Sequence, residues 1–190
     1  METIENPVTG ERAVLVESSR DSGGARTVMD LEVAPGGGPP AHSHDAHRER
    51  IDVLYGVMEV TVDGVTRRLG AGEHVVIEPG SVHAWRNASS DRVLRFRGMH
   101  TPGNPGFEVA LRVLFGLARD GEVRRSGLPR RFGDLALIFE WNQGLPAGPI
   151  RLLGPVAAWS ARRARARGRA AELLRRYGCE EPGALQAAAR

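Results

Sequence analysis

Four side chains in the first half of the chain have the types and spacing of a metal site. His42 and His44 are two residues apart, so on a β-strand both imidazoles point to the same face of the sheet. Glu49 alternates with Ile51 and Val53, which places its carboxylate on the apolar face of the following strand. A carboxylate on an apolar face is costly unless a cation pairs with it. The pattern therefore predicts a metal ion held by two imidazoles and one carboxylate.

A third imidazole comes from a later segment. His83 shares parity with Trp85 and is expected to point inward from a separate strand. Three neutral nitrogens and one carboxylate suit Mn, Fe, Co, Ni, Cu or Zn, and do not suit Ca or Mg. His47 could replace one of these ligands, but it is expected in the loop between the strands. Cys179 is the only cysteine, which excludes an intrachain disulfide and a cysteine-based zinc site.

The elements that must position these residues are short strands. Alternating apolar and polar residues recur at short, even intervals over 27–33, 49–55, 57–62, 65–69, 74–77, 83–86 and 92–98. Asp63-Gly64 predicts a hairpin turn because both residues tolerate a positive φ. Many short strands with such turns are typical of a β-sandwich or barrel.

Helical periodicity begins after the turn at 101–105. We expect helices over 107–118, over 134–143 and from about Pro155 to Tyr177, and we expect Gly178 to end the last of them. The final helix has one narrow face of small residues: Ala157, Ala161, Ala164, Gly168 and Ala171. This face offers little apolar area, so the final helix is expected to dock weakly. Residues 1–105 are predicted to form a β-barrel domain, and residues 106–190 a helical extension packed on it.

Two motifs resemble those of the cupin superfamily, specifically the small single-domain bacterial cupins. The first, G-x5-H-x-H-x(3–4)-E-x6-G, is present in full at Gly36, His42, His44, Glu49 and Gly56. The second, G-x5-P-x-G-x2-H-x3-N, is present at Gly72, Gly80, His83 and Asn87. Its proline is displaced to Pro79, with Glu78 at the usual position, and no ligand position is affected. The resemblance extends over about residues 10–100.

The resemblance implies a fold, a ligand set and a range of activities. A cupin fold is a double-stranded β-helix, or jelly-roll barrel. In the family, the positions of His42, His44, Glu49 and His83 are the usual metal ligands. One divalent transition metal per chain is expected, with Fe or Mn favoured and Ni, Zn, Cu or Co as alternatives. Cupins of this type are often dimers, and a homodimer is expected.

The function expected from these features is a mononuclear-metal oxidoreductase, dioxygenase-like, that acts on a small organic molecule. A non-enzymatic small-molecule-binding or regulatory cupin is the alternative, and a sugar-type isomerase is a third possibility. No catalytic acid or base is identified beyond the metal ligands. Four further side chains are candidates for a substrate pocket because they share inward parity: Tyr55, Met58, Trp85 and His100. For Met58, packing in the core is the better interpretation.

The charge is concentrated in the last part of the chain. All 26 basic residues are arginines; residues 151–190 contain nine of them and three acids, whereas residues 1–150 contain 17 and 20 acids. A packed helix with solvated or ion-paired arginines is favoured, with contact to a membrane surface as the alternative. Aromatic residues do not interleave with the arginines, so no nucleic acid is expected. Apolar runs are far shorter than the roughly 18 residues of a spanning helix, and a cytoplasmic protein is expected.

Overall fold

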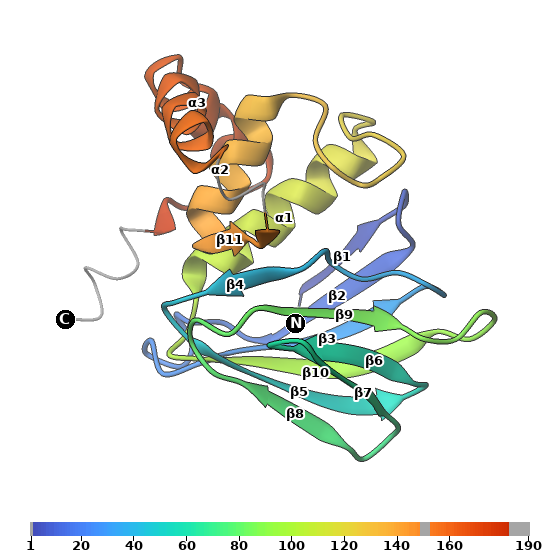
Figure 1. Ribbon diagram of the computed structural model, residues 1–190. Helices are drawn as coiled ribbons and strands as arrows, with labels where there is room; N and C mark the ends of the chain where they lie inside the picture. The colour runs from blue at the N-terminus through green and yellow to red at the C-terminus, as the bar shows by residue number, and fades with distance from the viewer. Residues whose placement is uncertain (1, 149–152, 183–190) are drawn as a thin grey trace.

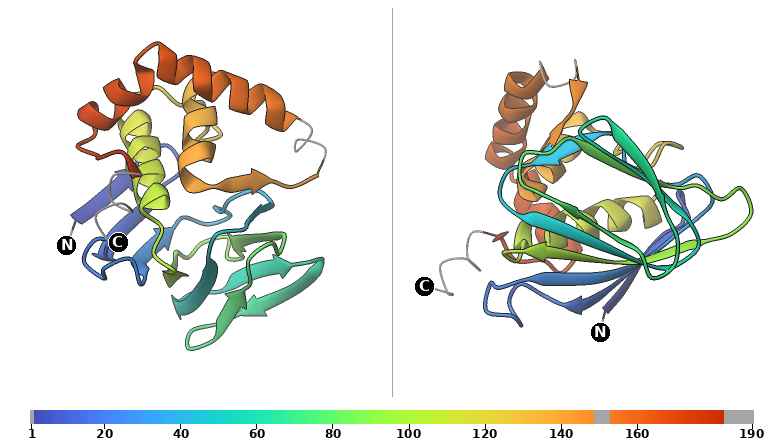
Figure 2. Two further views of the ribbon diagram at one scale, coloured as in Figure 1. Left: turned by 90° about the vertical axis from the view of Figure 1, so that its left-hand side faces the viewer. Right: turned by 60° about the horizontal axis from the view of Figure 1, so that its bottom comes forward.

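The strands form two antiparallel sheets that face each other in a jelly-roll barrel. The computed structural model describes residues 2–148 and 153–182. The first sheet contains, in spatial order, β1 (Glu2–Asn6), β2 (Glu11–Glu17), β3 (Thr27–Val33), β10 (Leu94–Thr101), β5 (Arg48–Tyr55) and β8 (His74–Ile77). The second contains β11 (Gly144–Pro146), β4 (His42–His44), β9 (His83–Asn87), β6 (Met58–Val62) and β7 (Val65–Leu69). The two sheets lie below the helices in Figure 1 and are seen from another side in Figure 2.

An apolar core fills the space between the sheets. Inward positions alternate along each strand, as Ile51 and Val53 of β5 and Leu94 and Phe96 of β10 show; all four are buried. The predicted mainly-β class is thus confirmed. The predicted hairpin is confirmed too, since Val62 pairs with Val65 and the two intervening residues have positive φ.

A helical layer covers one side of the barrel. It consists of α1 (Pro105–Arg119), α2 (Phe132–Asn142), α3 (Gly154–Ala166) and α4 (Arg169–Arg176). Helix α1 lies next to β1 and supports α2 on its other side, as Figure 1 shows. Its N-terminus is capped by Asn104, whose side-chain oxygen accepts a hydrogen bond from the backbone of Phe107. None of the helices in the described part of the chain has the length and apolarity needed to cross a bilayer.

The final helix is broken, which corrects the prediction of one helix from Pro155 to Tyr177. Gly168 adopts a φ of 75° and separates α3 from α4. This left-handed conformation is accessible to glycine at little cost, so the chain turns there. As a result Leu173 and Leu174 of α4 are buried in the helical core together with Leu117 and Leu137. The expectation of weak docking is therefore wrong for α4.

The stretch after α2 returns to the barrel. Its three residues form β11, which pairs with the histidine-bearing strand β4, with Gly144 opposite His44 and Pro146 opposite His42. The backbone N–H of Ala147 extends the pairing to the carbonyl of Ala41 at 3.0 Å. The helical layer is thus connected directly to the edge of the sheet that bears the predicted metal ligands. The division of the chain into separate units at residues 105 and 106 stays a prediction.

Candidate metal centre

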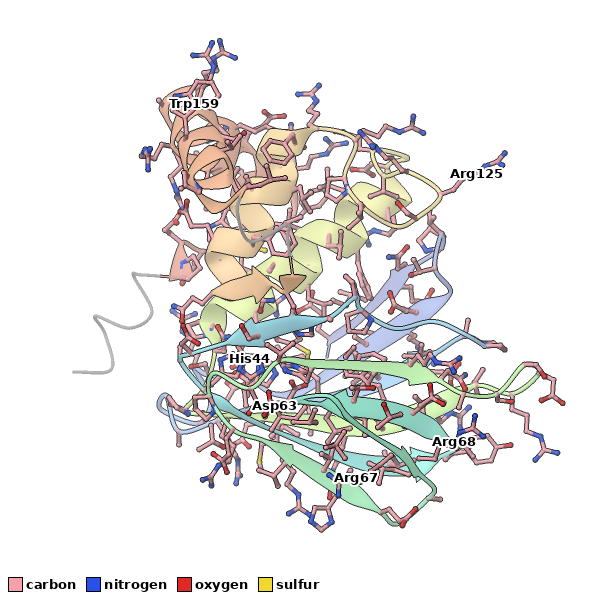
Figure 3. All side chains as sticks on the ribbon, in the orientation of Figure 1. His44, Asp63, Arg67, Arg68, Arg125 and Trp159 are labelled. Atoms are coloured by element: carbon pink, nitrogen blue, oxygen red, sulfur yellow. The ribbon has the colours of Figure 1, made fainter. Side chains whose placement is uncertain are left out.

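The two histidine-bearing strands lie side by side in the second sheet. Strand β4 pairs with β9 so that His42 stands opposite His83, and His44 follows two residues later on the same face. Glu49 enters from the first sheet at the start of β5, on the inward side that it shares with Ile51. His44, His83 and Glu49 are all buried. Figure 3 shows His44 at the end of the barrel that lies nearest the helices.

One carboxylate oxygen lies between two imidazoles. The Oε2 atom of Glu49 is 3.3 Å from Nε2 of His44 and 3.3 Å from Nε2 of His83. One donor atom from each of the three residues lies within 4.8 Å of the other two. Strands of both sheets thus bring two imidazole nitrogens and one carboxylate oxygen close together.

The other ring nitrogen of each histidine is fixed by the backbone. Nδ1 of His44 donates to the carbonyl of His47 at 3.0 Å, and Nδ1 of His83 donates to that of Ser81 at 3.1 Å. A carbonyl only accepts, so Nδ1 must carry a hydrogen, and Nε2 is the atom that each ring directs at Glu49, as a lone pair when the ring is neutral. Nε2 of His83 is buried and has no hydrogen-bond partner among the described residues. Lone pairs that face a carboxylate require a cation between them, so these residues fit a metal ion.

The pKa shifts point to the same preference for positive charge. Burial raises the pKa of Glu49, but the neighbouring imidazoles, His100 first, outweigh burial and hold the pKa well below its usual range. Burial lowers the pKa of His83, yet the nearby carboxylate of Glu49 more than compensates and the pKa is raised. The carboxylate is therefore ionised and attracts a cation, either a proton on an imidazole or a metal ion.

His42, the fourth predicted ligand, lies at the margin of this cluster. Its ring centroid is 4.3 Å from that of His83 and 6.2 Å from that of His44, and Nδ1 donates to the carbonyl of Pro40 at 2.9 Å. It is partly exposed, unlike the other two imidazoles. Burial, followed by the charge of His83, lowers the pKa of His42, which keeps Nε2 free of a proton. Its role as a ligand stays a prediction, and it marks the side from which solvent reaches the site.

The family comparison supports the interpretation of these residues. A family model described as "Cupin domain" matches residues 29–96, the segment that contains all four predicted ligands. Residues 29–96 of the barrel form a cupin domain. Comparison with curated protein sequences gives no match.

Solved structures with a similar fold include three from different bacteria. KdgF from Halomonas sp. is 17% identical, with 54% of this chain and 86% of that chain covered and a TM-score of 0.47. A predicted oxalate decarboxylase from Thermotoga maritima is 20% identical, with 53% and 90% covered and a TM-score of 0.47. The polyketide cyclase RemF from Streptomyces resistomycificus is 25% identical, with 48% and 64% covered and a TM-score of 0.43.

Two further histidines extend the cluster of the cupin domain toward α1. His47 lies in the loop after β4, where it is buried and stacks on His44 with 3.9 Å between ring centroids. His100, a predicted pocket residue, stands opposite Glu49 in the pairing of β10 with β5. Its ring centroid lies 4.3 Å from that of His47. Burial, then the charge of His100, lowers the pKa of His47 to about 3, so its ring is neutral.

Asn104 is a site neighbour that sequence reasoning missed. Its Nδ2 lies 3.3 Å from Nδ1 of His47, while its Oδ1 caps α1. An asparagine just before Pro105 is a recognisable helix N-cap signal, but its contact with His47 depends on tertiary packing. The cap thereby connects the first helix to the row of imidazoles.

Two of the predicted pocket residues do not reach the centre. Tyr55 is 48% exposed and lies six residues along β5 from Glu49, about 20 Å away. A bulge at Leu54 shifts the pairing with β10 and turns the next side chain to the outer face, which explains the error. Met58 is fully buried at the end of β6 remote from His83, so it is a core residue.

Trp85 remains a neighbour of the centre. It shares the inward face of β9 with His83, two residues away, and is buried. Its ring packs edge-on against Phe96 with 4.8 Å between centroids. The indole therefore lies on the inner wall of the barrel beside the third imidazole.

Proposed function

We propose that this cupin domain binds one divalent transition metal ion and acts as a dioxygenase-like oxidoreductase on a small organic molecule. His44, Glu49 and His83 would hold the ion, with His42 as the fourth ligand. The observation that supports this most directly is the pair of Nε2 atoms, from His44 and His83, that face one oxygen of an ionised carboxylate at 3.3 Å. Iron and manganese are favoured, while Ni, Zn, Cu and Co have compatible ligand preferences.

The bound ion would supply Lewis acidity and one-electron redox chemistry at its open coordination positions. The protein would orient the ligands through the backbone carbonyls of His47 and Ser81, which fix two imidazole tautomers. Burial of Glu49 excludes bulk water from one side of the centre. The partly exposed His42 lies where a small substrate would enter. His100, with Nε2 3.8 Å from Oε1 of Glu49, would help to orient that carboxylate.

Metal analysis followed by oxygen measurements tests this proposal. The purified protein is expected to retain about one ion per chain, and Glu49→Gln to lose it because a charged ligand becomes neutral. Glu59→Gln is the matched control, since Glu59 pairs with Arg86 on the surface of the barrel. Steady O2 uptake by the iron- or manganese-loaded protein with an enediol, a flavonol or a diketone would support the oxidoreductase. Full metal retention by Glu49→Gln would refute the site.

A metal-bearing binding module is the second candidate. The near-complete burial of His44 and His83 favours it, because structural metal sites are closed whereas catalytic sites keep an open position. Tight binding of a small molecule to the metal-loaded protein, without O2 uptake or any other turnover, would select this candidate. Both candidates share the same ligands, so the metal analysis alone does not separate them.

A further inference from the structure

The arginines of the helical layer greatly outnumber the carboxylates available to them. Five acidic residues lie between residues 119 and 176, and each one pairs with Arg165, Arg169 or Arg176. These acids are Asp120, Glu122, Asp134, Glu140 and Glu172. In the described chain the exposed arginines of this region that pair with no carboxylate are Arg119, Arg124, Arg125, Arg130, Arg131, Arg162, Arg163, Arg167 and Arg175. The layer therefore presents uncompensated positive charge.

Large apolar side chains are exposed in the same layer. Leu153, Val156 and Trp159 are 50%, 51% and 56% exposed and follow one another at intervals of three residues, which places them on neighbouring turns of one side of α3. The guanidinium of Arg163 lies 5.5 Å from the centre of the Trp159 ring. In Figure 3, Trp159 lies at the outer end of the helical layer, away from the barrel.

The start of α2 adds to this surface. A Cβ at Gly133 would lie 3.4 Å from Cβ of Ala164 and 3.9 Å from Oγ of Ser160, so α2 begins against the middle of α3. Phe132, the preceding residue, is 46% exposed, and Arg131 is exposed beside it. We call the resulting surface the arginine–tryptophan face; it consists of Arg131, Phe132, Val156, Trp159, Arg162 and Arg163.

We propose that the arginine–tryptophan face docks on an anionic lipid surface. Arginines without carboxylate partners attract lipid phosphates, and exposed aliphatic and aromatic side chains insert at the boundary between headgroups and acyl chains. Trp159 is suited to that boundary because its ring is amphipathic. A nucleic acid would use the arginines but would leave Val156 exposed to water, so the combination favours lipid. The proposal is independent of the metal centre.

Vesicle co-sedimentation with the full chain tests this docking. We expect binding to vesicles of phosphatidylglycerol and phosphatidylcholine at about 0.1 M salt, and much weaker binding to phosphatidylcholine alone. Each surface arginine contributes roughly fivefold to such affinity, so Arg162→Gln with Arg163→Gln should weaken binding about 25-fold. Trp159→Ser should also weaken it, because the inserted ring is lost.

The control is a pair of arginines on the barrel. Arg67 and Arg92 are exposed and have no carboxylate partner in the described structure, and Figure 3 shows Arg67 far from Trp159. Arg67→Gln with Arg92→Gln removes the same charge and should leave vesicle binding unchanged. Equal losses in both double variants would overturn the proposal, because net charge alone would explain them. So would binding to duplex DNA without vesicle binding, or no binding to anionic vesicles.

Discussion

His100 of β10 faces Glu49 of the neighbouring strand β5, with Nε2 3.8 Å from Oε1. The other oxygen of the same carboxylate lies between His44 and His83. One oxygen is thus oriented toward the ligand nitrogens while the other is turned to a different imidazole. Groups that bond to a metal-binding carboxylate orient it and adjust its affinity for the ion.

Replacing His100 should therefore weaken metal retention without removing a ligand. We expect about 10- to 100-fold weaker affinity in His100→Phe, which keeps the packing against Phe107 but loses the contact with Glu49. His100→Gln should recover part of the loss because its amide can donate to Oε1. Competition with a metal chelator measures both. His74→Phe, at an exposed position of β8, is the control and should behave like the parent protein.

The remaining histidines should differ in their importance for binding. His83→Ala removes a metal-ligating nitrogen at the centre of the cluster, so we expect stoichiometric metal binding to be lost. His42→Ala removes a ring at the margin, so a weakened but measurable affinity is expected. Isothermal titration with Mn²⁺ or Co²⁺ compares the two variants. An equal loss in both would place His42 among the principal ligands in the metal-bound protein.

Much of this centre is predictable because its geometry follows from local periodicity. The two-residue spacing of His42 and His44 and the parity of Glu49 need only a β-strand to place them inward. Tyr55 shows the limit of this reasoning, because a single bulge between it and Glu49 reverses the face of the strand. Parity is reliable only as far as the next irregularity in the pairing.

The helical part contains the features that the sequence does not predict. Gly168 fits a face of small residues as well as it fits a helix break. Only the packing of Leu173 of α4 with Leu117 and Leu137 distinguishes the two interpretations. The pairing of β11 with β4 has no local signal either, since three residues after a helix are too few for a periodic pattern. Both features depend on contacts between distant segments.

A homodimer remains the expected assembly. Strand β1 forms one edge of the first sheet and pairs only with β2 among the described strands, so its outer backbone groups are available to a second copy. Sedimentation velocity at micromolar concentration should give the mass of two chains. Ile4→Pro removes a backbone donor from this edge strand and should shift the distribution toward the monomer if β1 forms the interface. A monomer in the parent protein would contradict the expectation.

The close contact of α1 with α2 predicts a stability effect at Gly106. A Cβ at this position would collide with the backbone carbonyl oxygen of Trp141 and would lie 3.3 Å from Oδ1 of Asn104. Gly106→Ala should therefore cost about 1–3 kcal/mol in the free energy of unfolding, because one helix must shift. Gly154→Ala is the control, since no atom of the described residues lies within 4 Å of its Cβ, and it should change stability by less than about 0.5 kcal/mol. Urea denaturation measures the free energy of unfolding of both variants, and an unchanged m-value shows that the two values can be compared.

Docking of α4 should weaken in acid through Glu122. Its carboxylate pairs with Nη1 of Arg176 at 2.6 Å and with Nη2 of Arg169 at 3.1 Å, and the bond to Arg176 lowers the pKa of Glu122. The folded pKa lies below the unfolded one, so this stabilisation is complete above the unfolded value of about 4.3 and is lost as the pH falls through the folded value.

Glu122→Gln should therefore melt below the parent protein at pH 7 and converge with it near pH 3. The difference at pH 7 should be at most about 1 kcal/mol because the pair is partly solvated. Glu5→Gln disrupts a single exposed pair with Arg12 at 3.4 Å, so its melting temperature should be almost the same as that of the parent protein at either pH. Thermal melts followed by circular dichroism at several pH values measure both variants. A gap between Glu122→Gln and the parent that widens in acid would contradict the sign derived from the lowered pKa.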